Sequence, residues 1–432
     1  MSQAPPLSTS LRVRLSAMMF LQYAIWGSWL PFLYSFLEHR RLSGAEIGDM
    51  FAVGAVGAIV GPFIAGQVAD RYFSTEKFLG ISHLLGAILV WQLASIGGYG
   101  GFLAFSLLYG LVYMPTLALT NSLSFHHLPD RDRDFGRVRL WGTIGWIVVG
   151  LAMGQWLALR HSPAELSGDA LHAAQVAGKA DAFRLSAVLG AVMGLYCFTL
   201  PRTPPVRGAQ RNATLEALGE ARRQPLLTLF LLAVPVSCIH QFYFVQTETF
   251  LGVKQLAAPA WSRAIFGVGG GGLMTVGQMS EILVLAAIPL VATRVSRKAL
   301  LAVGLVAYGL RMALFAYVDT LPLPTMATLL AGIALHGLCF GCFLFVAFMV
   351  VDEESSADVR ASAQNLFNLV IVGVGVIVGS KIAGWVGDWA AGDYRRLFSV
   401  PMWASLACLA ILLALYPGGR PLRSAASEPA ST

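Results

Sequence analysis

Charged residues are scarce in this 432-residue sequence, where Asp, Glu, Lys and Arg make up only 12% of the chain. Soluble proteins carry about 25%, so these charges cannot cover a water-facing surface, and an ordinary soluble domain is excluded. Hydrophobic residues make up 56% of the chain, in runs of roughly twenty residues or more, the length of a helix that spans a bilayer. Because a helix satisfies its own backbone hydrogen bonds, we expect an all-α integral membrane protein.

Cysteine is also sparse. All five cysteines lie within apolar runs: Cys197, Cys238, Cys339, Cys342 and Cys408. Their positions predict no disulfide framework, and we interpret the CxxC spacing of the third and fourth as helix packing, because it has no zinc or redox context. The apolar runs also lack a metal-ligand cluster and a paired nucleophile and base. We therefore expect neither an enzyme nor a cofactor.

The apolar runs predict twelve membrane spans. They lie at residues 15–37, 47–69, 78–98, 101–125, 136–158, 183–201, 225–250, 265–293, 299–318, 323–351, 361–387 and 397–416. We interpret the net charge of +7 as basic loops that fix the orientation of the protein in the membrane, rather than as a nucleic-acid-binding surface. With both termini in the cytoplasm, the inner loops hold 18 Lys and Arg residues and the outer loops hold 9. This bias predicts that orientation.

A polar stretch rich in Pro, Arg and Glu divides the spans into two sets of six. We expect a bundle at 1–200, a cytoplasmic linker at 201–224, a second bundle at 225–418 and a cytoplasmic tail at 419–432. The loop after the second span contains Gly66, Asp70 and Arg71. Together these features resemble the major facilitator superfamily, although residues 72–74 depart from the usual ending of its signature. The resemblance implies two halves that alternate about a site near the midplane.

An ionisable side chain within a span usually faces a cavity or a partner. Arg139 opens the fifth predicted span and shares a helix face with Thr143 and Trp146, at positions i, i+4 and i+7. This face combines a cation, a hydroxyl and an aromatic ring, as a site for a polar solute would. The alternative is that Arg139 reaches out to lipid headgroups.

Two further spans carry polar residues. Gln241 lies deep in the seventh span, where a contact with the solute and a helix–helix hydrogen bond are both open. Glu248 lies near the outer end of that span, and we expect it to be solvated. In the tenth span His336 precedes Phe340 by four residues. It could bind the solute or be a packed, hydrogen-bonded histidine.

The eighth span holds the deepest carboxylate. Gln278 and Glu281 are three residues apart and share a helix face. Because burial favours the protonated form of a carboxyl group, Glu281 is the best candidate for reversible protonation. The alternative is a structural ion pair with Arg139 or Arg311.

Several motifs occur in the same order in the nucleoside:proton symporters of bacterial inner membranes, which this chain resembles over nearly its whole length. The motifs begin at Phe20, Tyr113, Arg139, Gln278, Leu310 and Arg360. The resemblance implies one central cavity for the base and ribose, with uptake driven by the proton gradient. It also implies the binding residues Arg139, Thr143, Gln241, Gln278, Glu281 and Phe340.

Four positions depart from the pattern of the best-known members. Trp146 stands where they have Phe, Phe244 replaces an amide, His336 replaces Tyr, and Gly341 replaces an intramembrane Asp. We include the first three in the predicted site, and Glu281 and His336 are the proton-coupling candidates. The changes at Phe244, His336 and Gly341 leave open the alternative that the chain carries another polar solute, such as a sugar.

A receptor that does not transport is a rival from another class, but the chain lacks a sizeable soluble domain that could relay a signal. We expect a monomer in the bacterial inner membrane, with both termini cytoplasmic. Its partners would be a nucleoside, protons and lipid, without nucleic acid. Uptake of labelled solute with and without a proton gradient would separate these hypotheses.

Overall fold

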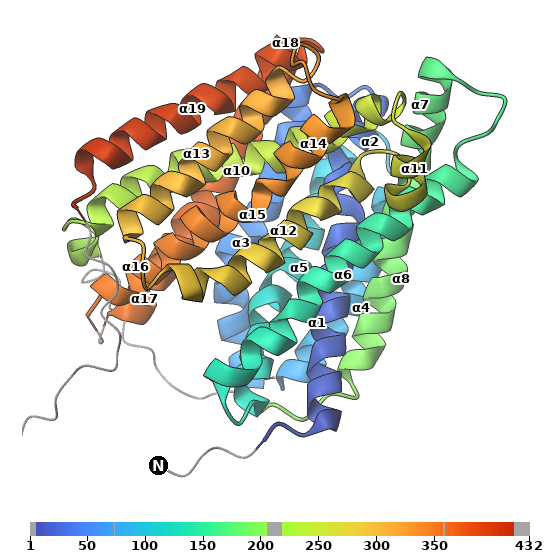
Figure 1. The fold of residues 1–432 in the computed structure, drawn as a ribbon. Coiled ribbons are helices and arrows are strands. Elements are labelled where there is room, and N and C mark those ends of the chain that lie inside the picture. Colours follow the sequence, from blue (N-terminus) through green and yellow to red (C-terminus); the bar gives the residue numbers. More distant parts are fainter. Residues whose placement is uncertain (1–5, 73, 205–217, 357–358, 419–432) are drawn as a thin grey trace, which may run out of the picture. The chain divides into compact units, whose positions relative to one another are not determined.

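The computed structural model describes residues 6–72, 74–204, 218–356 and 359–418, and throughout this part of the chain the regular structure is helical (Figure 1). The first elements are α1 (Thr9–Trp29), η1 (Leu30–Phe32), α2 (Leu33–His39), α3 (Gly44–Tyr72), α4 (Thr75–Leu93), α5 (Tyr99–His127), α6 (Arg131–Arg160), α7 (Gly168–Gly178) and α8 (Ala180–Cys197). The others are α10 (Leu226–Gln255), α11 (Ala260–Phe266), α12 (Gly271–Val291), α13 (Arg297–Ala316), α14 (Thr325–Ala334), α15 (His336–Leu338), η2 (Cys339–Phe345), α16 (Val346–Glu354), α17 (Arg360–Asn368), η3 (Leu369–Gly375), α18 (Val376–Ala390) and α19 (Tyr394–Leu415).

The predicted all-helical membrane fold is confirmed. Among the described residues, nine helices are long and apolar enough to cross a membrane. Every predicted span falls mainly on helix, although the eighth is interrupted between α11 and α12, at residues 267–270. The first three predicted spans lie on α1 to α4, which are not among the nine, so the count of twelve stays a prediction.

By packing, the chain falls into two compact units. Unit 1 comprises Met1–Gln210, Gln241–Thr275 and Val376–Trp389, and unit 2 comprises Arg211–His240, Val276–Gly375 and Ala390–Thr432. Unit 1 therefore contains α1 to α8 together with most of α18 and the second part of α10. The predicted division into two six-helix bundles with a linker and a tail stays a prediction, and residues 205–217 and 419–432 lie outside the described part.

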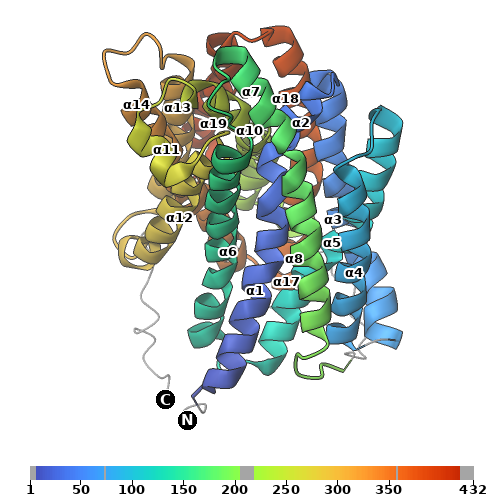
Figure 2. The same ribbon diagram turned by 90° about the vertical axis from the view of Figure 1, so that its right-hand side faces the viewer.

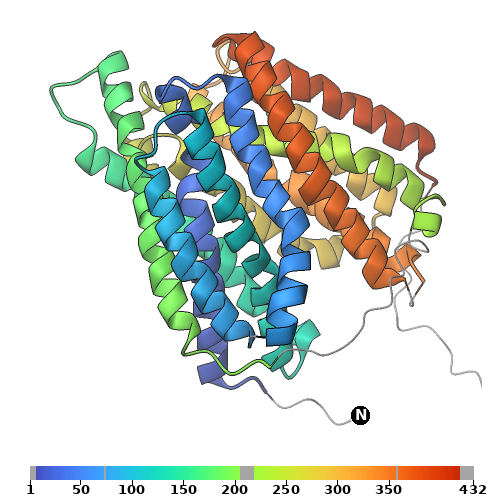
Figure 3. The same cartoon turned by 180° about the vertical axis from the view of Figure 1, so that it is seen from behind.

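Small residues bring the helices of unit 1 close together. A Cβ atom added at Gly145 of α6 would lie 2.3 Å from the carbonyl oxygen of Phe20 on α1, and one at Gly57 of α3 would lie 2.3 Å from the carbonyl oxygen of Gly110 on α5. Such contacts are typical of helices that pack in a membrane. Figure 2 shows α1 beside α6 and α8, and Figure 3 shows α8 (green) beside α4 (blue).

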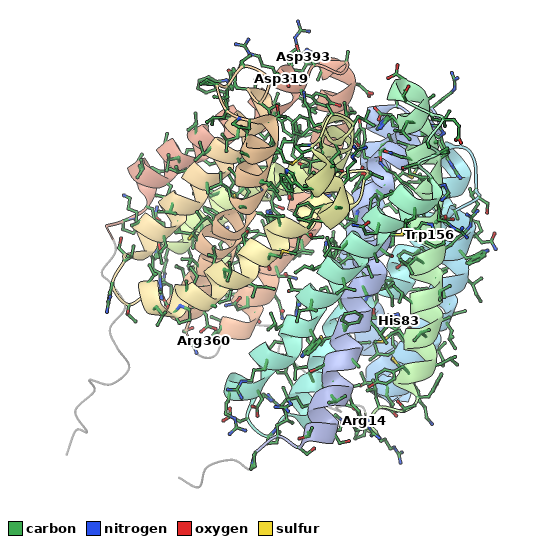
Figure 4. All side chains as sticks on the ribbon, turned by 45° about the vertical axis from the view of Figure 1, so that its right-hand side comes forward. Arg14, His83, Trp156, Asp319, Arg360 and Asp393 are labelled. Atoms are coloured by element: carbon green, nitrogen blue, oxygen red, sulfur yellow. The ribbon has the colours of Figure 1, made fainter. Side chains whose placement is uncertain are left out.

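A buried polar network also links α1, α4 and α5. Gln22 donates to the Thr116 hydroxyl at 2.8 Å and accepts from His83 Nε2 at 2.9 Å. The Tyr113 hydroxyl donates to the backbone carbonyl of Gln22. All four residues are buried, and Figure 4 labels His83 within the bundle. Because each polar group has a partner, the network can lie inside the membrane without a large desolvation cost.

In unit 2, α13 packs against α19, α14 and η2. The sequence predicts one continuous helix for the tenth span and one for the eleventh, but each contains a π-helical segment, η2 and η3. Such segments often occur at functional sites. Gly341 lies in η2, where an added Cβ would be 2.6 Å from Cγ1 of Val284 on α12. In this packing, a side chain such as Asp does not fit at position 341.

Candidate functional site

The predicted site residues form two groups, one in each unit. The first group lies on α6 and α10 in unit 1: Arg139, Thr143, Trp146, Gln241 and Phe244. The second group lies on α12, α15 and η2 in unit 2: Gln278, Glu281, His336 and Phe340. Each group is described within its own unit, and the expectation of one shared cavity stays a prediction.

In the first group, Arg139 lies over an aromatic ring. Its guanidinium carbon is 3.9 Å from the centroid of the Tyr23 ring on α1. Gly142 makes this contact possible, because an added Cβ there would lie 2.6 Å from the Tyr23 ring and 2.8 Å from Arg139 Nη1. A cation over a ring is held in place while its N–H groups can still donate hydrogen bonds. Among the two alternatives for Arg139, this contact favours a residue directed into the helix bundle.

Trp146 joins the two helices that carry the first group. Its ring packs edge-on against Trp26, with centroids 5.7 Å apart, and against Phe244, at 6.4 Å. Gly27 provides the space, since an added Cβ would lie 2.7 Å from the Trp146 ring. Trp146 and Phe244 are both half-buried, so they form an aromatic surface of the kind on which a base can stack.

Gln241 makes the helix–helix hydrogen bond that the sequence left open. Its side-chain nitrogen donates to the Ser380 hydroxyl on α18 at 3.1 Å. This bond fixes the orientation of the amide. The carbonyl oxygen of the same amide can still accept a hydrogen bond from a solute. Thr143 is half-buried on the same face of α6 as Arg139.

The second group is organised around His336. Arg311 Nη1 lies 3.1 Å from His336 Nδ1, and His336 Nε2 lies 3.6 Å from Glu281 Oε2. Because a guanidinium can only donate, Nδ1 must accept, and the imidazole is then neutral with its proton on Nε2, on the side of Glu281. Arg311 is fully buried, whereas the Glu281 side chain is 17% exposed. Arg311 and Glu281 therefore lie on opposite sides of the same imidazole. The direct ion pair between them, which was the alternative for Glu281, stays a prediction.

Two residues outside the predicted site complete this cluster. His240 stacks on His336, with ring centroids 5.4 Å apart, and its Nδ1 lies 2.7 Å from the Tyr308 hydroxyl. Its ring is 6.2 Å from that of Phe340. Tyr308 precedes Arg311 by three residues on α13. This i, i+3 spacing places both side chains on one helix face, and it was the feature of the sequence that could have indicated Tyr308 as part of the cluster.

Gln278 is 6% exposed, and its Oε1 atom has no hydrogen-bond partner among the described residues. A buried acceptor without a partner costs about 1–3 kcal/mol. A ligand donor would remove that cost, so the geometry favours Gln278 as a contact for a solute.

The expectation for Glu248 is wrong. Its carboxylate is fully buried and forms an ion pair with Lys179 at 2.7 Å. The reason is that α2 and the junction between α7 and α8 lie against this end of α10. Nothing in the sequence indicates that Lys179, counted as an outer-loop residue, is buried. Because Lys179 and Glu248 are far apart in the sequence, neither residue carries a local signal for such a pair.

The remaining predictions concern the signature residues and metals. Gly66, Asp70 and Arg71 lie in the last turns of α3, where the side chains fall outside the described part, so their role stays a prediction. Among the described residues there is no cluster of three or more His, Cys, Asp or Glu that could hold a metal ion.

Comparison with known proteins gives a family match over most of the chain. A family model described as "Nucleoside H+ symporter" matches residues 9–417. Three relatives come from Escherichia coli (strain K12). YegT is 34% identical over 382 residues, covering 86% of this chain and 83% of its own. The nucleoside permease NupG is 30% identical over 388 residues, covering 87% and 88%. The xanthosine permease is 30% identical over 420 residues, covering 94% of each chain.

The fold agrees with these relatives. The crystal structure of the nucleoside transporter NupG matches this chain with a TM-score of 0.81 and 26% sequence identity, over 94% of this chain and 99% of NupG.

Proposed function

Because the chain belongs to the nucleoside H+ symporter family, we infer that it is a secondary active transporter that imports nucleosides together with protons. It has the major facilitator fold and is not an enzyme. The observation that carries the proton-coupled part is the arrangement of Glu281, His336 and Arg311 in unit 2. The Glu281 carboxylate lies on the Nε2 side of the neutral imidazole, and the buried Arg311 cation lies on the Nδ1 side. The charge of a carboxyl group in such a position can change during a transport cycle.

We assign the binding roles by chemistry. The half-buried rings of Trp146 and Phe244 stack on the base, and the amides of Gln241 and Gln278 pair with polar groups of the nucleoside. Arg139 donates to the ribose hydroxyls, with Tyr23 holding its guanidinium in place. Thr143, Phe340 and His336 complete the proposed set. Glu281 is the proposed proton-coupling residue, with His336 beside it.

The direct test is uptake of labelled nucleoside into proteoliposomes under an imposed proton gradient. We expect accumulation that collapses when the gradient is dissipated. A competition panel of nucleosides, free bases and sugars in the same assay identifies the solute. Competition by sugars alone would contradict nucleoside transport and support the alternative carrier.

Replacing Gln278 by Ala is expected to weaken nucleoside binding by about 1–3 kcal/mol, because a buried hydrogen bond to the solute is lost. Equilibrium binding of labelled nucleoside to the purified protein measures it. Ser405→Ala is a matched control, since Ser405 is buried in unit 2 and its hydroxyl already donates to the backbone carbonyl of Met402. Unchanged affinity in Gln278→Ala would place this residue in helix packing.

We propose that the chain works as a monomer in the bacterial inner membrane, with both termini and the 201–224 linker in the cytoplasm. Single cysteines at Glu165 and Arg202, both exposed, should then react with an impermeant thiol reagent from opposite sides. Lys179 cannot serve as the outer reporter because it is fully buried. The native cysteines are buried or half-buried and give a low background. Labelling of both positions from one side would contradict this topology.

A further inference from the structure

A fully buried ionic cluster lies at one end of unit 1. Lys179 Nζ is 2.7 Å from Glu248 Oε1 and donates to the Ser35 hydroxyl at 2.8 Å, and that hydroxyl donates to Glu248 Oε2 at 2.7 Å. The Lys179 and Glu248 side chains are both 0% exposed. The three residues come from α2, the α7–α8 junction and α10. Figure 2 shows α2 and α7 at the same end of unit 1.

The cluster joins segments that are far apart in the sequence. Ser35 lies in the first predicted span and Lys179 lies in the loop between the fifth and the sixth, whereas Glu248 lies in the seventh, 213 residues after Ser35. A carrier that works by alternating access must separate such segments at each end in turn. A contact between such segments is therefore either broken in every transport cycle or located in a part of the protein that stays fixed.

The chemistry of the Lys179–Glu248 contact favours a contact that breaks in every cycle. A buried ion pair is a poor permanent fastening, because apolar residues of similar volume hold a static interface equally well or better. The close contacts of α1 with α6 and of α3 with α5 use glycine and backbone instead. In a contact that opens to water, charged residues have an advantage: both ions are hydrated again on opening, whereas apolar surfaces would resist exposure.

Other charges lie around the cluster. Glu38 on α2 interacts electrostatically with Lys179, with Glu248 and with Asp388 on α18, and burial raises the pKa of the Glu38 carboxyl. Asp388 accepts hydrogen bonds from the backbone nitrogens of Gly44 and Ala45, at the start of α3, at 2.6 and 2.9 Å. Opening this end therefore releases more than one polar contact.

We propose, on the basis of the transport function inferred above, that Lys179, Ser35 and Glu248 form an ionic latch that holds this end of unit 1 closed and breaks once in each transport cycle. A substitution that removes one charge of a buried ion pair leaves the other charge without compensation, whereas a substitution of both residues leaves no buried charge. The latch therefore predicts opposite effects for single and double substitutions.

The test measures backbone hydrogen exchange of the purified full-length protein in lipid nanodiscs. In Glu248→Gln, exchange in α2 and at the end of α10 is expected to rise on the order of 100-fold, because one half of a buried pair is gone. Asp49→Asn is the matched control: its pair with Lys381 lies in the same unit, but the two side chains are 26% and 42% exposed. This control is expected to change exchange by no more than about fivefold. Equal changes in the two variants would overturn the latch.

A double variant keeps the proposal testable if the single variant folds poorly. Lys179→Met with Glu248→Met removes both charges, so protection of α2 should return to the wild-type level. Nucleoside affinity should stay unchanged while uptake slows by about tenfold or more, because the closed end now opens with apolar side chains exposed. Uptake at the wild-type rate would overturn the latch. Failure of the unmodified protein to transport nucleoside would instead refute the proposed function, since hydrogen exchange reports on the latch without transport.

Discussion

Glu281→Gln is expected to abolish accumulation of nucleoside while leaving its exchange across the membrane intact. The amide has the size of the carboxyl group and most of its hydrogen-bonding capacity, but it cannot release a proton. A difference of one pH unit across the membrane supplies about 1.4 kcal/mol per proton. With one proton per nucleoside, this free energy supports a nucleoside concentration ratio of about ten. We expect about tenfold accumulation by the unmodified protein under that gradient and a ratio of about one for the variant.

The measurement compares net uptake and counterflow in the same proteoliposomes. Glu353→Gln is the control, because Glu353 also lies in unit 2 and pairs with an arginine, Arg297, but its side chain is 36% exposed. This variant should accumulate nucleoside normally. Normal accumulation by Glu281→Gln would remove Glu281 as the coupling residue. The next candidate would be His336, whose imidazole titrates near neutral pH when it is unperturbed.

Gly267→Ala is expected to cause the largest loss of stability. Gly267 ends α11 with φ 69° and ψ −144°, a conformation that side chains rarely adopt. An added Cβ would also lie 1.9 Å from the backbone carbonyl carbon of Gly154 on α6. Backbone strain and overpacking each cost about 1–3 kcal/mol, so the free energy of unfolding should fall by about 2–6 kcal/mol.

Gly98→Ala separates the two effects. Gly98 has φ 81°, but an added Cβ there meets nothing within 4 Å. It should therefore lose only the strain component, about 1–3 kcal/mol. Denaturant unfolding in detergent, followed by near-ultraviolet circular dichroism, measures both variants. A loss for Gly267→Ala no larger than that for Gly98→Ala would mean that α6 and α11 can move apart at this contact.

The helices of this protein are predictable because their cause is local. Runs of apolar residues predict spans, and every predicted span lies mainly on helix. The π-helical segments η2 and η3 were not predicted. In η2, Gly341 and Phe343 lie against α12 and α13, and such tertiary contacts leave no pattern in the local sequence. The helix α7 was also missed, because it lies in the predicted loop between the fifth and the sixth span, where no long apolar run marks a helix.

The candidate site was predictable where neighbouring residues share a helix face. Arg139 and Trp146 do so on α6, and the structure gives each an aromatic partner. The role of Glu248 was not predictable in this way, because its partner Lys179 is distant in sequence and each residue alone resembles a solvated loop charge. Pairing of that kind is decided by tertiary packing, which removes both charges from water together.

The buried network of Gln22, His83, Thr116 and Tyr113 has a consequence for biogenesis. Each of α1, α4 and α5 enters the bilayer with polar side chains that lipid cannot satisfy, and only the neighbouring helices supply the partners. Interhelical hydrogen bonds in membranes contribute about 0.6 kcal/mol each on average, too little to drive assembly but enough to discriminate between neighbours. An incorrectly paired helix would leave its amide or imidazole facing hydrocarbon without a hydrogen-bond partner, which is energetically unfavourable. The three helices thus select one another during insertion.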